Sequence, residues 1–518
     1  MNRSLRFGIM ALFAISISLQ APAQDKVVKK IIEIGKTDNR VMEHEDHLAN
    51  YIGGRPVGSS ALTHAEAWVK EKFESWGLEV MVQEAGEINV GFDRGPWFGR
   101  MLSEDGMDLH FGTPSYTAPT KGKQTGIVLI EPHSRREFER MKGALKGAWV
   151  LLDAESNGMA IDWSDKANET RADIIRQNEE IDRQNMEIRR YNMTHRYETP
   201  KEMLPYKKVT APFYKEMVEA GVAGFIRSAK VPLRIMYDRA NCYDITMENL
   251  PRVCDICLDE AQFEIIKKKV QRKDIFQLEF DIRNHFYRGP VKYHNIIGII
   301  RGSKYPNEYV ITGGHLDAYD NGGGAVDDGN GASLNMEVGR MLATAGARPK
   351  RSIMVCIWTG EEYGLLGSKF FVENKTVPLE KISNYFNRDG GPLMSTGVTV
   401  PPAMYDDFVE VCKPVMDLDP EIPFTVSKRP GEPQPVPTRA GGSDHAYFAM
   451  SGVPTIGFHE TDPKGYNFEY QEIWHTERDI YNKVIPEYME HSATVTAVVV
   501  YGLANLDHQL SRQGLYKD

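Results

Sequence analysis

Cysteine, positive charge and long apolar runs are all scarce in this chain. Five cysteines in 518 residues are too few for disulfides to be the main support of the fold. The formal net charge of −10 disfavours nucleic acid or an anionic membrane surface as a partner. Composition is otherwise that of a globular protein, with 41% hydrophobic and 26% charged residues, so disorder is not expected over most of the length.

The amino terminus has the pattern of a secretory signal peptide. Arg3 and Arg6 precede an apolar run from Phe7 to Leu19, and Ala21-Pro22-Ala23 follows it. The run is shorter than the roughly 20 residues that a membrane-spanning helix needs. We therefore expect residues 1–23 to be removed and the mature protein to be exported, periplasmic or extracellular, without a membrane anchor. Loss of the two arginines takes the net charge from −10 to −12.

One cysteine pair has the spacing of half a zinc knuckle, Cys254-x-x-Cys257. No second pair accompanies it, and its setting, "RVCDICLD", is typical of a strand, so we do not expect metal binding there. A disulfide between Cys242 and either member of the pair stays open.

The pattern of predicted helices and strands changes twice along the chain. Residues 24–95 contain a glycine-rich turn, "IGGRPVGS", and an amphipathic helix pattern, "HAEAWVKEKFESW". Residues 96–288 hold short strand-like runs, and from 289 to 518 strand and helix patterns alternate. Such alternation predicts an α/β fold with a mostly parallel mixed sheet flanked by helices. At this length we expect two domains, or one domain with a large insertion.

A charged helical segment near 163–205 interrupts the middle region. Ile174, Ile181 and Ile188 repeat every seven residues, but Asn178 and Asn185 between them are polar. A stripe this narrow fits a projecting helix that packs on another surface, such as the second subunit of a homodimer. It fits equally well a solvated helix that lies on its own domain.

Three expected strands end in groups that can bind a metal. His315 and Asp317 follow the first strand, Glu361 and Glu362 the second, and Asp389 the third. Ligands in α/β sheets gather at the carboxyl ends of strands. Imidazole together with carboxylate suits zinc or another first-row dication, whereas calcium and magnesium prefer oxygen alone.

The loop "GGHLDAYDNGGGAVDDGNGA", residues 313–332, has three possible interpretations: a phosphate cradle, a flexible acidic turn and half of a metal site. A phosphate cradle would need a lysine and few acids, but this loop has no lysine and four aspartates, which repel phosphate. A merely flexible acidic turn would leave the acids of the neighbouring strand ends unexplained. Half of a metal site is therefore the favoured interpretation.

The sequence resembles the di-zinc exopeptidase family that includes bacterial leucyl aminopeptidases and carboxypeptidase Q. The resemblance rests on that loop and on "WTGEEYGLLGS", "NRDGG", "GGSDHAYFAMSGVPTIGF" and "WHTERD", in this order across about 290–485, with "IGGRPVGSSA" at the front. It implies a phosphorylase/hydrolase-like peptidase domain built from 24–95 and 289–518. Residues 96–288 would be an inserted, β-rich, protease-associated domain that limits substrate length.

The resemblance also implies a cofactor of two zinc ions and a peptide substrate. His315 and Asp389 would bind one ion, Glu362 and His475 the other, and Asp327 both. Glu361 would be the general base. Asp317 would orient the imidazole of His315.

Other polar residues near these motifs receive different roles. Asp328 is expected to support the loop backbone or to cap the following helix, and Asp444 and His445 are not expected to bind zinc. Related aminopeptidases have a tyrosine just before the final histidine, where this chain has Trp474. The group that stabilises the oxyanion thus stays open, as does substrate contact by Arg439.

Three functions are compatible with the sequence. The favoured one is an exported zinc exopeptidase that acts on dipeptides or short peptides. Within the family, the motifs favour the carboxypeptidase Q branch. A glutaminyl cyclase-like acyl transferase would use one zinc and would not need all five ligands. A non-catalytic binding scaffold on the same fold would have lost ligands or base, whereas here every such position is filled.

Overall fold

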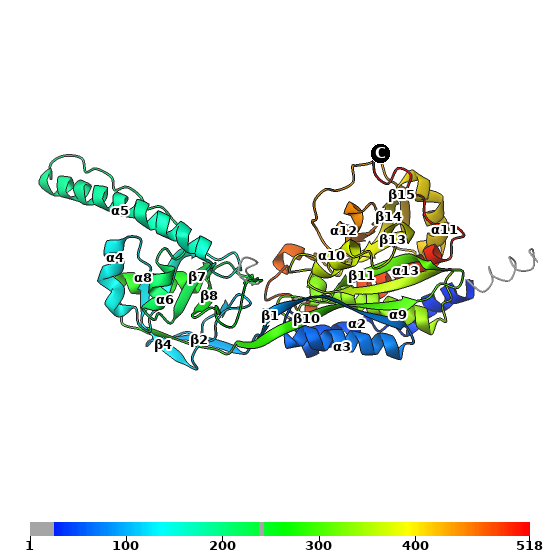
Figure 1. Ribbon diagram of the computed structural model, residues 1–518, viewed down its shortest axis with the longest axis horizontal. Helices are drawn as coiled ribbons and strands as arrows, with labels where there is room; N and C mark the ends of the chain where they lie inside the picture. The colour runs from blue at the N-terminus through cyan, green and yellow to red at the C-terminus, as the bar shows by residue number, and fades with distance from the viewer. Residues whose placement is uncertain (1–24, 238–242, 518) are drawn as a thin grey trace, which may run out of the picture.

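The computed structural model describes residues 25–237 and 243–517, which form two lobes joined by two long strands (Figure 1). The expected signal peptide, residues 1–23, and Cys242 lie outside the described residues. Among the helices that are described, none has the length and apolar character needed to cross a membrane.

A mixed five-stranded sheet forms the centre of the larger lobe, in the order β1-β10-β12-β11-β13. β11 pairs in parallel with β12 and β13, whereas β10 is antiparallel to β1 and β12. The strands are β1 (Glu79–Asp93), β10 (His285–Ile300), β11 (Tyr305–His315), β12 (Arg351–Trp358) and β13 (Ile382–Asn387). The expected α/β fold with a mixed sheet is confirmed.

Helices cover both faces of this sheet. Every residue of β12 is buried, because alternate side chains enter two different cores. Ile353 and its neighbours pack under α9 (Asn330–Thr344) and α13 (Pro486–Ala504), while Met354 and Trp358 pack under α10 (Leu366–Glu373) and α12 (His445–Met450). On the first face also lie residues 25–37, which are helical, and three further helices. These are α2 (Val41–Asp46), η1 (His47–Ile52) and α3 (Ser60–Ser75).

A small sheet extends the larger lobe, in the order β15-β14-β16, and α11 packs on it. Its elements are β14 (Met394–Val400), α11 (Tyr405–Met416), β15 (Thr425–Lys428) and β16 (Phe458–Thr461). Short helical turns lie in the connections. They are η3 (Ala325–Gly329), η4 (Leu379–Lys381), η5 (Pro402–Met404), η6 (Tyr470–Glu472) and η7 (Tyr481–Lys483).

The smaller lobe is built from two further sheets, β2-β9-β4 and β3-β8-β7-β6-β5. Its strands are β2 (Trp97–Leu102), β3 (Phe111–Gly112), β4 (Gln124–Gly126), β5 (Val128–Ile130), β6 (Trp149–Glu155), β7 (Gly224–Ala229), β8 (Cys254–Asp259) and β9 (Gln277–Ile282). Its helices are α4 (Arg135–Met141), η2 (Lys142–Ala144), α5 (Asp165–Thr194), α6 (Tyr214–Glu219) and α8 (Glu260–Arg272). β1 and β10 pair from Glu79–Ile299 to Asp93–His285 and link the lobes. The predicted boundary at 95 falls just after the end of β1 and the one at 289 falls within β10, and the division into domains stays a prediction.

The Cys-x-x-Cys pair lies in β8, as its setting suggested. Residues three apart in a strand point to opposite faces, and Cys254 packs beside Trp149 while Cys257 packs beside Leu233 and Ile235. Both sulfurs are buried as free thiols. The pair therefore cannot hold one metal ion between its two sulfurs.

The charged segment is a hairpin-like arm that projects from the smaller lobe (Figure 1). Its helix, α5, is followed by an extended return of the chain, and the two are joined by asparagines. Asn178, Asn185 and Asn192 each donate to a backbone carbonyl of the return and accept from the same residue's N–H. The residues bound in this way are Lys207, Leu204 and Lys201, respectively.

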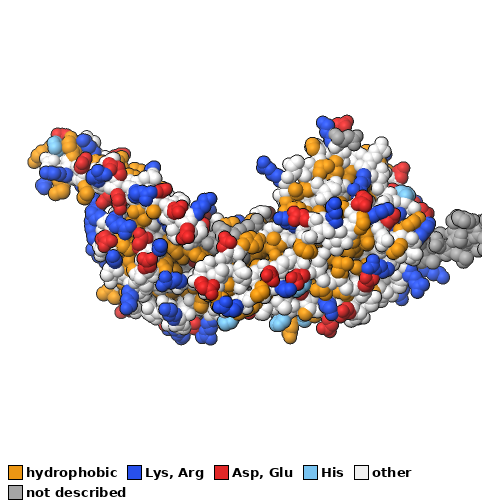
Figure 2. Space-filling model, in the orientation of Figure 1, with side chains coloured by type: hydrophobic (Ala, Val, Ile, Leu, Met, Phe, Trp, Pro, Cys, Tyr) orange, Lys and Arg blue, Asp and Glu red, His pale blue; other side chains and the backbone are white. Residues whose placement is uncertain are grey.

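The polar positions of the seven-residue repeat thus make the main contact of the arm. Asn178 and Asn185 are 1% and 2% exposed, whereas Ile174, Ile181 and Ile188 are only partly buried. Charged side chains of both signs cover the outside of the arm (Figure 2). The helix packs on its own chain, and a homodimer contact stays a prediction.

Candidate metal centre

Parallel strands bring the predicted ligands to one edge of the central sheet. His315 is the last residue of β11 and lies opposite Trp358, the last residue of β12. Gly313 pairs with Asn387 at the end of β13, so the three strands end nearly level. The segments that follow carry Glu361, Glu362 and Asp389 to the same place.

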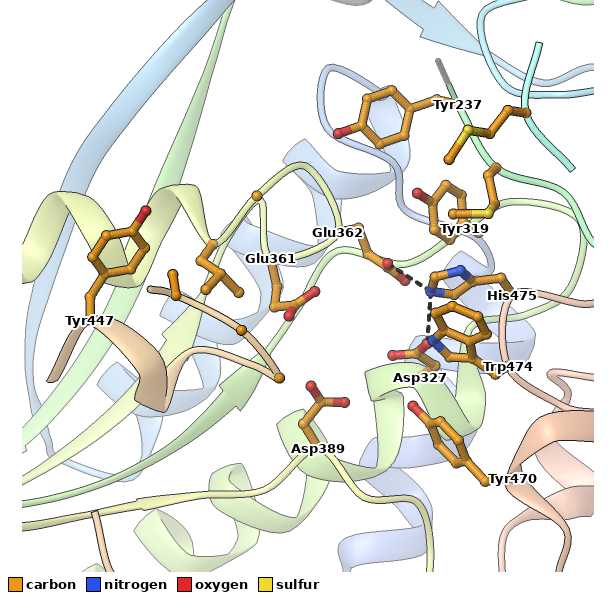
Figure 3. A pocket seen from close by; sticks show the side chains of 17 residues that line it. Tyr237, Tyr319, Asp327, Glu361, Glu362, Asp389, Tyr447, Tyr470, Trp474 and His475 are labelled. Carbon is orange, nitrogen blue, oxygen red and sulfur yellow. Dashed lines mark ion pairs between the residues drawn. The ribbon is translucent and has the colours of Figure 1, made fainter. Parts of the chain in front are cut away.

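Two groups of ligand atoms form there, each within 4.8 Å. One contains His315, Asp328 and Asp389, and His315 Nε2 lies 3.6 Å from Asp389 Oδ1. The other contains Asp327, Glu362 and His475, with His475 Nε2 2.9 Å from the Glu362 carboxylate. In Figure 3 the side chains of Asp327, Glu362, Asp389 and His475 converge on one space.

Asp327 lies between the two groups. Its Oδ1 is 3.3 Å from His315 Nε2, and its Oδ2 is 3.2 Å from His475 Nε2. One carboxylate therefore faces both imidazoles, which is the arrangement that a bridging ligand needs. The structure brings together all five predicted ligands.

The chemistry of the donors fits a pair of dications. Nε2 of His315 and Oδ2 of Asp327 are buried, and neither makes a hydrogen bond within the described parts of the chain. Burial of Glu362 raises its pKa to about 7, because a charged carboxylate is costly away from water. Bound cations would offset that cost, and mixed imidazole and carboxylate donors suit zinc.

Asp317 contacts both the imidazole of His315 and the turn that carries Glu361 and Glu362. His315 Nδ1 lies 2.8 Å from the backbone carbonyl of Asp317, whereas the Asp317 carboxylate is 3.7 Å away. That carboxylate accepts the backbone N–H groups of Glu361 and Glu362, at 3.0 and 3.2 Å. The main chain thus orients the imidazole, and the side chain holds the turn that presents the predicted base.

Asp328 supports the backbone, as expected. Its two oxygens accept the N–H groups of His315, at 3.0 Å, and of Gly331, at 2.9 Å. A Cβ on Gly314 or Gly331 would lie 2.6 or 2.3 Å from the same oxygens. Glycine at these positions therefore lets a fully buried carboxylate tie the strand end to the start of α9.

Two residues that the sequence did not single out hold the glycine loop. Arg55, fully buried, donates to five carbonyls, and those of Leu316, Gly323 and Gly324 flank the metal ligands. Asp479 accepts the N–H groups of Val326 and Asp327. Both lie in quoted motifs, "IGGRPVGS" and "WHTERD", but only the fold shows that they touch this loop.

The predicted base lies beside the ligands. Glu361 Oε2 is 4.0 Å from His315 Nε2, and the side chain is 12% exposed toward the pocket. Burial raises the pKa of Glu361 well above its usual range, and the negative charge of Asp389 raises it further. Among the described residues, Asp444 and His445 belong to neither group of ligand atoms.

A pocket of about 720 Å³ opens over the centre. Both lobes line it, because Met159, Met236 and Tyr237 come from the smaller lobe. The remaining walls are largely aromatic or glycine-rich. They include Tyr319, Tyr447, Tyr470, Trp474 and the segment 440–442.

Tyr470 is a further pocket residue that sequence reasoning missed. Its hydroxyl points toward the carboxylates of Asp327 and Asp389 (Figure 3). Trp474 follows one helical turn later, and its backbone N–H donates to the Tyr470 carbonyl at 2.8 Å. Burial raises the pKa of Tyr470, and the charge of Asp327 raises it further.

Comparisons with known proteins find relatives of this chain. Residues 295–500 match the model of Peptidase family M28. Carboxypeptidase Q of Rattus norvegicus is 24% identical over 495 residues, covering 94% of this chain and 91% of the relative. The corresponding protein of Mus musculus is 25% identical over 500 residues, with the same coverages.

Solved structures share the fold. A Peptidase M28 precursor from Shewanella amazonensis superposes with a TM-score of 0.56 at 18% identity, covering 94% of this chain and 98% of that one. BSAP, a zinc aminopeptidase from Bacillus subtilis, gives a TM-score of 0.51 at 16% identity, covering 92% and 97%.

Proposed function

The chain belongs to the M28 metallopeptidases, and from that premise we propose that it is an exported exopeptidase that uses two zinc ions to cleave dipeptides or short peptides. The observation that carries the proposal is the position of Asp327, which faces both His315 and His475 while Glu361 lies beside them outside both groups of ligand atoms. Zinc, when bound, polarises the scissile carbonyl and acidifies the attacking water.

The residues divide the work. His315, Asp389, Glu362 and His475 would hold the ions, and Asp327 would be shared between them. Glu361 takes the proton from water and returns it to the leaving amine. Asp317 fixes the backbone of the turn that carries Glu361.

Tyr470 is the best-placed donor for the oxyanion. Its hydroxyl points at the metal carboxylates from the side of the pocket opposite Glu361 (Figure 3). Trp474, which occupies the position of the family's tyrosine, instead lies against the ring of His475, with the ring centroids 4.0 Å apart and the planes tilted by 31°. A neutral hydroxyl so placed can donate to the oxygen that becomes negative during attack.

The other two functions are less well supported. A one-zinc acyl transferase leaves the second group, with Glu362 and His475, without a purpose. A non-catalytic scaffold leaves the buried, unligated Glu361 unexplained, because an isolated buried carboxylate costs stability.

The experiment is a comparison of Glu361→Gln with His475→Ala. Glu361→Gln should lower peptide hydrolysis by at least about 100-fold while zinc content and melting temperature stay at wild-type values. His475→Ala should lower the zinc content from close to two ions per chain. Near wild-type turnover in Glu361→Gln would remove the general base from the proposal, and zinc close to one per chain in the wild type would favour the cyclase.

A further inference from the structure

The loop that carries the ligand His475 pairs with a segment of the smaller lobe. Ile235 donates its backbone N–H to the His475 carbonyl at 2.9 Å. Two residues further along the loop, Glu477 donates its backbone N–H to the Leu233 carbonyl at 3.2 Å. The two segments run antiparallel, and Met236, the next residue of the smaller lobe, lines the pocket over the metal centre. A loosening of this pairing therefore reaches both a metal ligand and a wall of the pocket.

The carboxylate of Glu477 adds two contacts to the smaller lobe. One oxygen accepts the backbone N–H of Leu233 at 3.2 Å. The other lies 2.9 Å from Nε2 of His110, whose Nδ1 is 3.2 Å from the carboxylate of Asp259. Within residues 25–237 and 243–517, neither carboxylate forms an ion pair with a lysine or an arginine, so the imidazole is their counter-charge.

The backbone of His110 is held firmly in the smaller lobe. Its N–H donates to Gln262 Oε1 at 2.7 Å, and its carbonyl accepts the N–H of Asp259 at 3.0 Å. The ring thus projects from a fixed point, immediately before β3 and beside the end of β8. A neutral imidazole has one N–H and one lone pair, so it can donate to one carboxylate, whereas an imidazolium donates to both.

We propose that His110, with both ring nitrogens protonated, is a positioning residue that locks the loop of His475 to the smaller lobe. The proposal rests on the proposed peptidase function, in which His475 binds zinc and the two lobes share one substrate pocket. Loss of one ring proton leaves a lone pair facing a carboxylate, which is repulsive. The contacts with Leu233 and Ile235 then hold the loop without this bridge, and the pocket loosens.

The lock depends on pH through the ring of His110. The charged groups that face it are Asp259, at the N-cap of α8, and Glu477, on the ligand loop. Partial burial lowers the pKa of His110, but the hydrogen bonds to Glu477 and Asp259 outweigh burial, and the pKa lies above its ordinary value. The bridge is therefore complete below about pH 6.5, the ordinary histidine pKa. It is lost as pH rises through the higher pKa of the folded protein.

The experiment measures hydrogen exchange of the Ile235 and Glu477 amides in the zinc-loaded enzyme, as protection relative to an unstructured peptide at the same pH. Protection in wild type should fall by at least about 10-fold between about pH 5.5 and about pH 8.5, the factor that one hydrogen bond to a charged group contributes. His110→Gln, which carries no charge, should give the low value at both pH values. His110→Arg, whose charge does not titrate, should give the high value at both.

His294→Gln is the matched control. His294 bonds to Glu66 at 2.9 Å, and that hydrogen bond raises its pKa, but both residues lie in the larger lobe. This variant should keep the wild-type dependence of protection on pH. The ratio of the wild-type KM for a dipeptide to that of His110→Arg should rise by about 10-fold over the same pH range. Titration of the metal centre is common to both proteins and cancels in this ratio.

Wild-type protection that does not change with pH would overturn the proposal. So would a dependence on pH that persists in both His110→Gln and His110→Arg. Loss of the dependence in His294→Gln as well would also overturn it, because the effect would then be one of general stability. Zinc-loaded wild type that cleaves no peptide would instead refute the proposed function, while exchange of the two amides would still test the role of His110.

Discussion

Replacement of Asp479 tests whether the backbone of the glycine loop controls metal binding. Asp479 is 5% exposed and, among the described residues, belongs to neither group of ligand atoms; it accepts the N–H groups of Val326 at 2.5 Å and Asp327 at 3.3 Å. Its own backbone carbonyl accepts from Gly323 at 2.7 Å. Asp479→Asn keeps the size of the side chain but leaves one acceptor oxygen for two buried donors.

The size of the effect follows from that count. One buried N–H without a partner costs about 1–3 kcal/mol, and since about 1.4 kcal/mol corresponds to a factor of ten, the cost converts to roughly 5- to 150-fold. Because the affected N–H belongs to the bridging residue or its neighbour, we expect zinc affinity to fall by about 10- to 100-fold, the range found for residues that support metal ligands.

The assay is a zinc titration against a chelating dye, with zinc per chain measured after dialysis. Asp462→Asn is the control, because Asp462 also accepts two backbone N–H groups, from Tyr466 and Asn467, but in a turn away from the ligands. Zinc affinity of Asp479→Asn within twofold of wild type would refute the reasoning. So would an equal loss in Asp462→Asn, because the effect would then be one of general stability.

Three further predictions concern the hydroxyl, the arm and the metal. Tyr470→Phe should lower kcat by about 100-fold with KM and zinc content unchanged; it should also weaken a phosphonate analogue of the tetrahedral state by a similar factor, and equal analogue binding would exclude the hydroxyl. Asn185→Ala should leave two backbone groups of Leu204 unpaired and speed tryptic cleavage after Lys201 and Lys207 by at least about 10-fold, with zinc content intact; an unchanged rate would contradict the role of the asparagines. Chelation should lower the melting temperature, because it leaves the crowded carboxylates without cations; two equivalents of zinc should restore it, and a melting temperature indifferent to zinc would contradict a structural contribution of the metal.

The sequence predicted the parts of the site that lie at strand ends. Alternating patterns locate the ends of β11, β12 and β13, and parallel pairing then requires His315, Glu362 and Asp389 to meet. Resemblance to a family added His475, which no local pattern reveals. These predictions succeed because each depends on a short stretch of chain or on a shared motif.

The residues that the sequence did not reveal act between distant segments. Arg55 binds carbonyls more than 260 positions away, and Arg234 stacks on Trp474 from the other lobe. Neither contact leaves a periodic pattern. The asparagines of α5 did leave a seven-residue pattern, but polar residues at such spacing normally indicate a solvated face, and only the returning chain explains why they are buried.

The asparagine contacts of the arm also fix the length of the helix relative to that of the returning chain. Seven helical residues rise about 10.5 Å, and three residues of extended chain span about 10 Å, which is why Asn178, Asn185 and Asn192 meet every third residue of the return. The arm can therefore be shortened or lengthened only in paired steps, seven residues in the helix with three in the return. A change of length in the helix alone, or in the return alone, would put every later asparagine out of register.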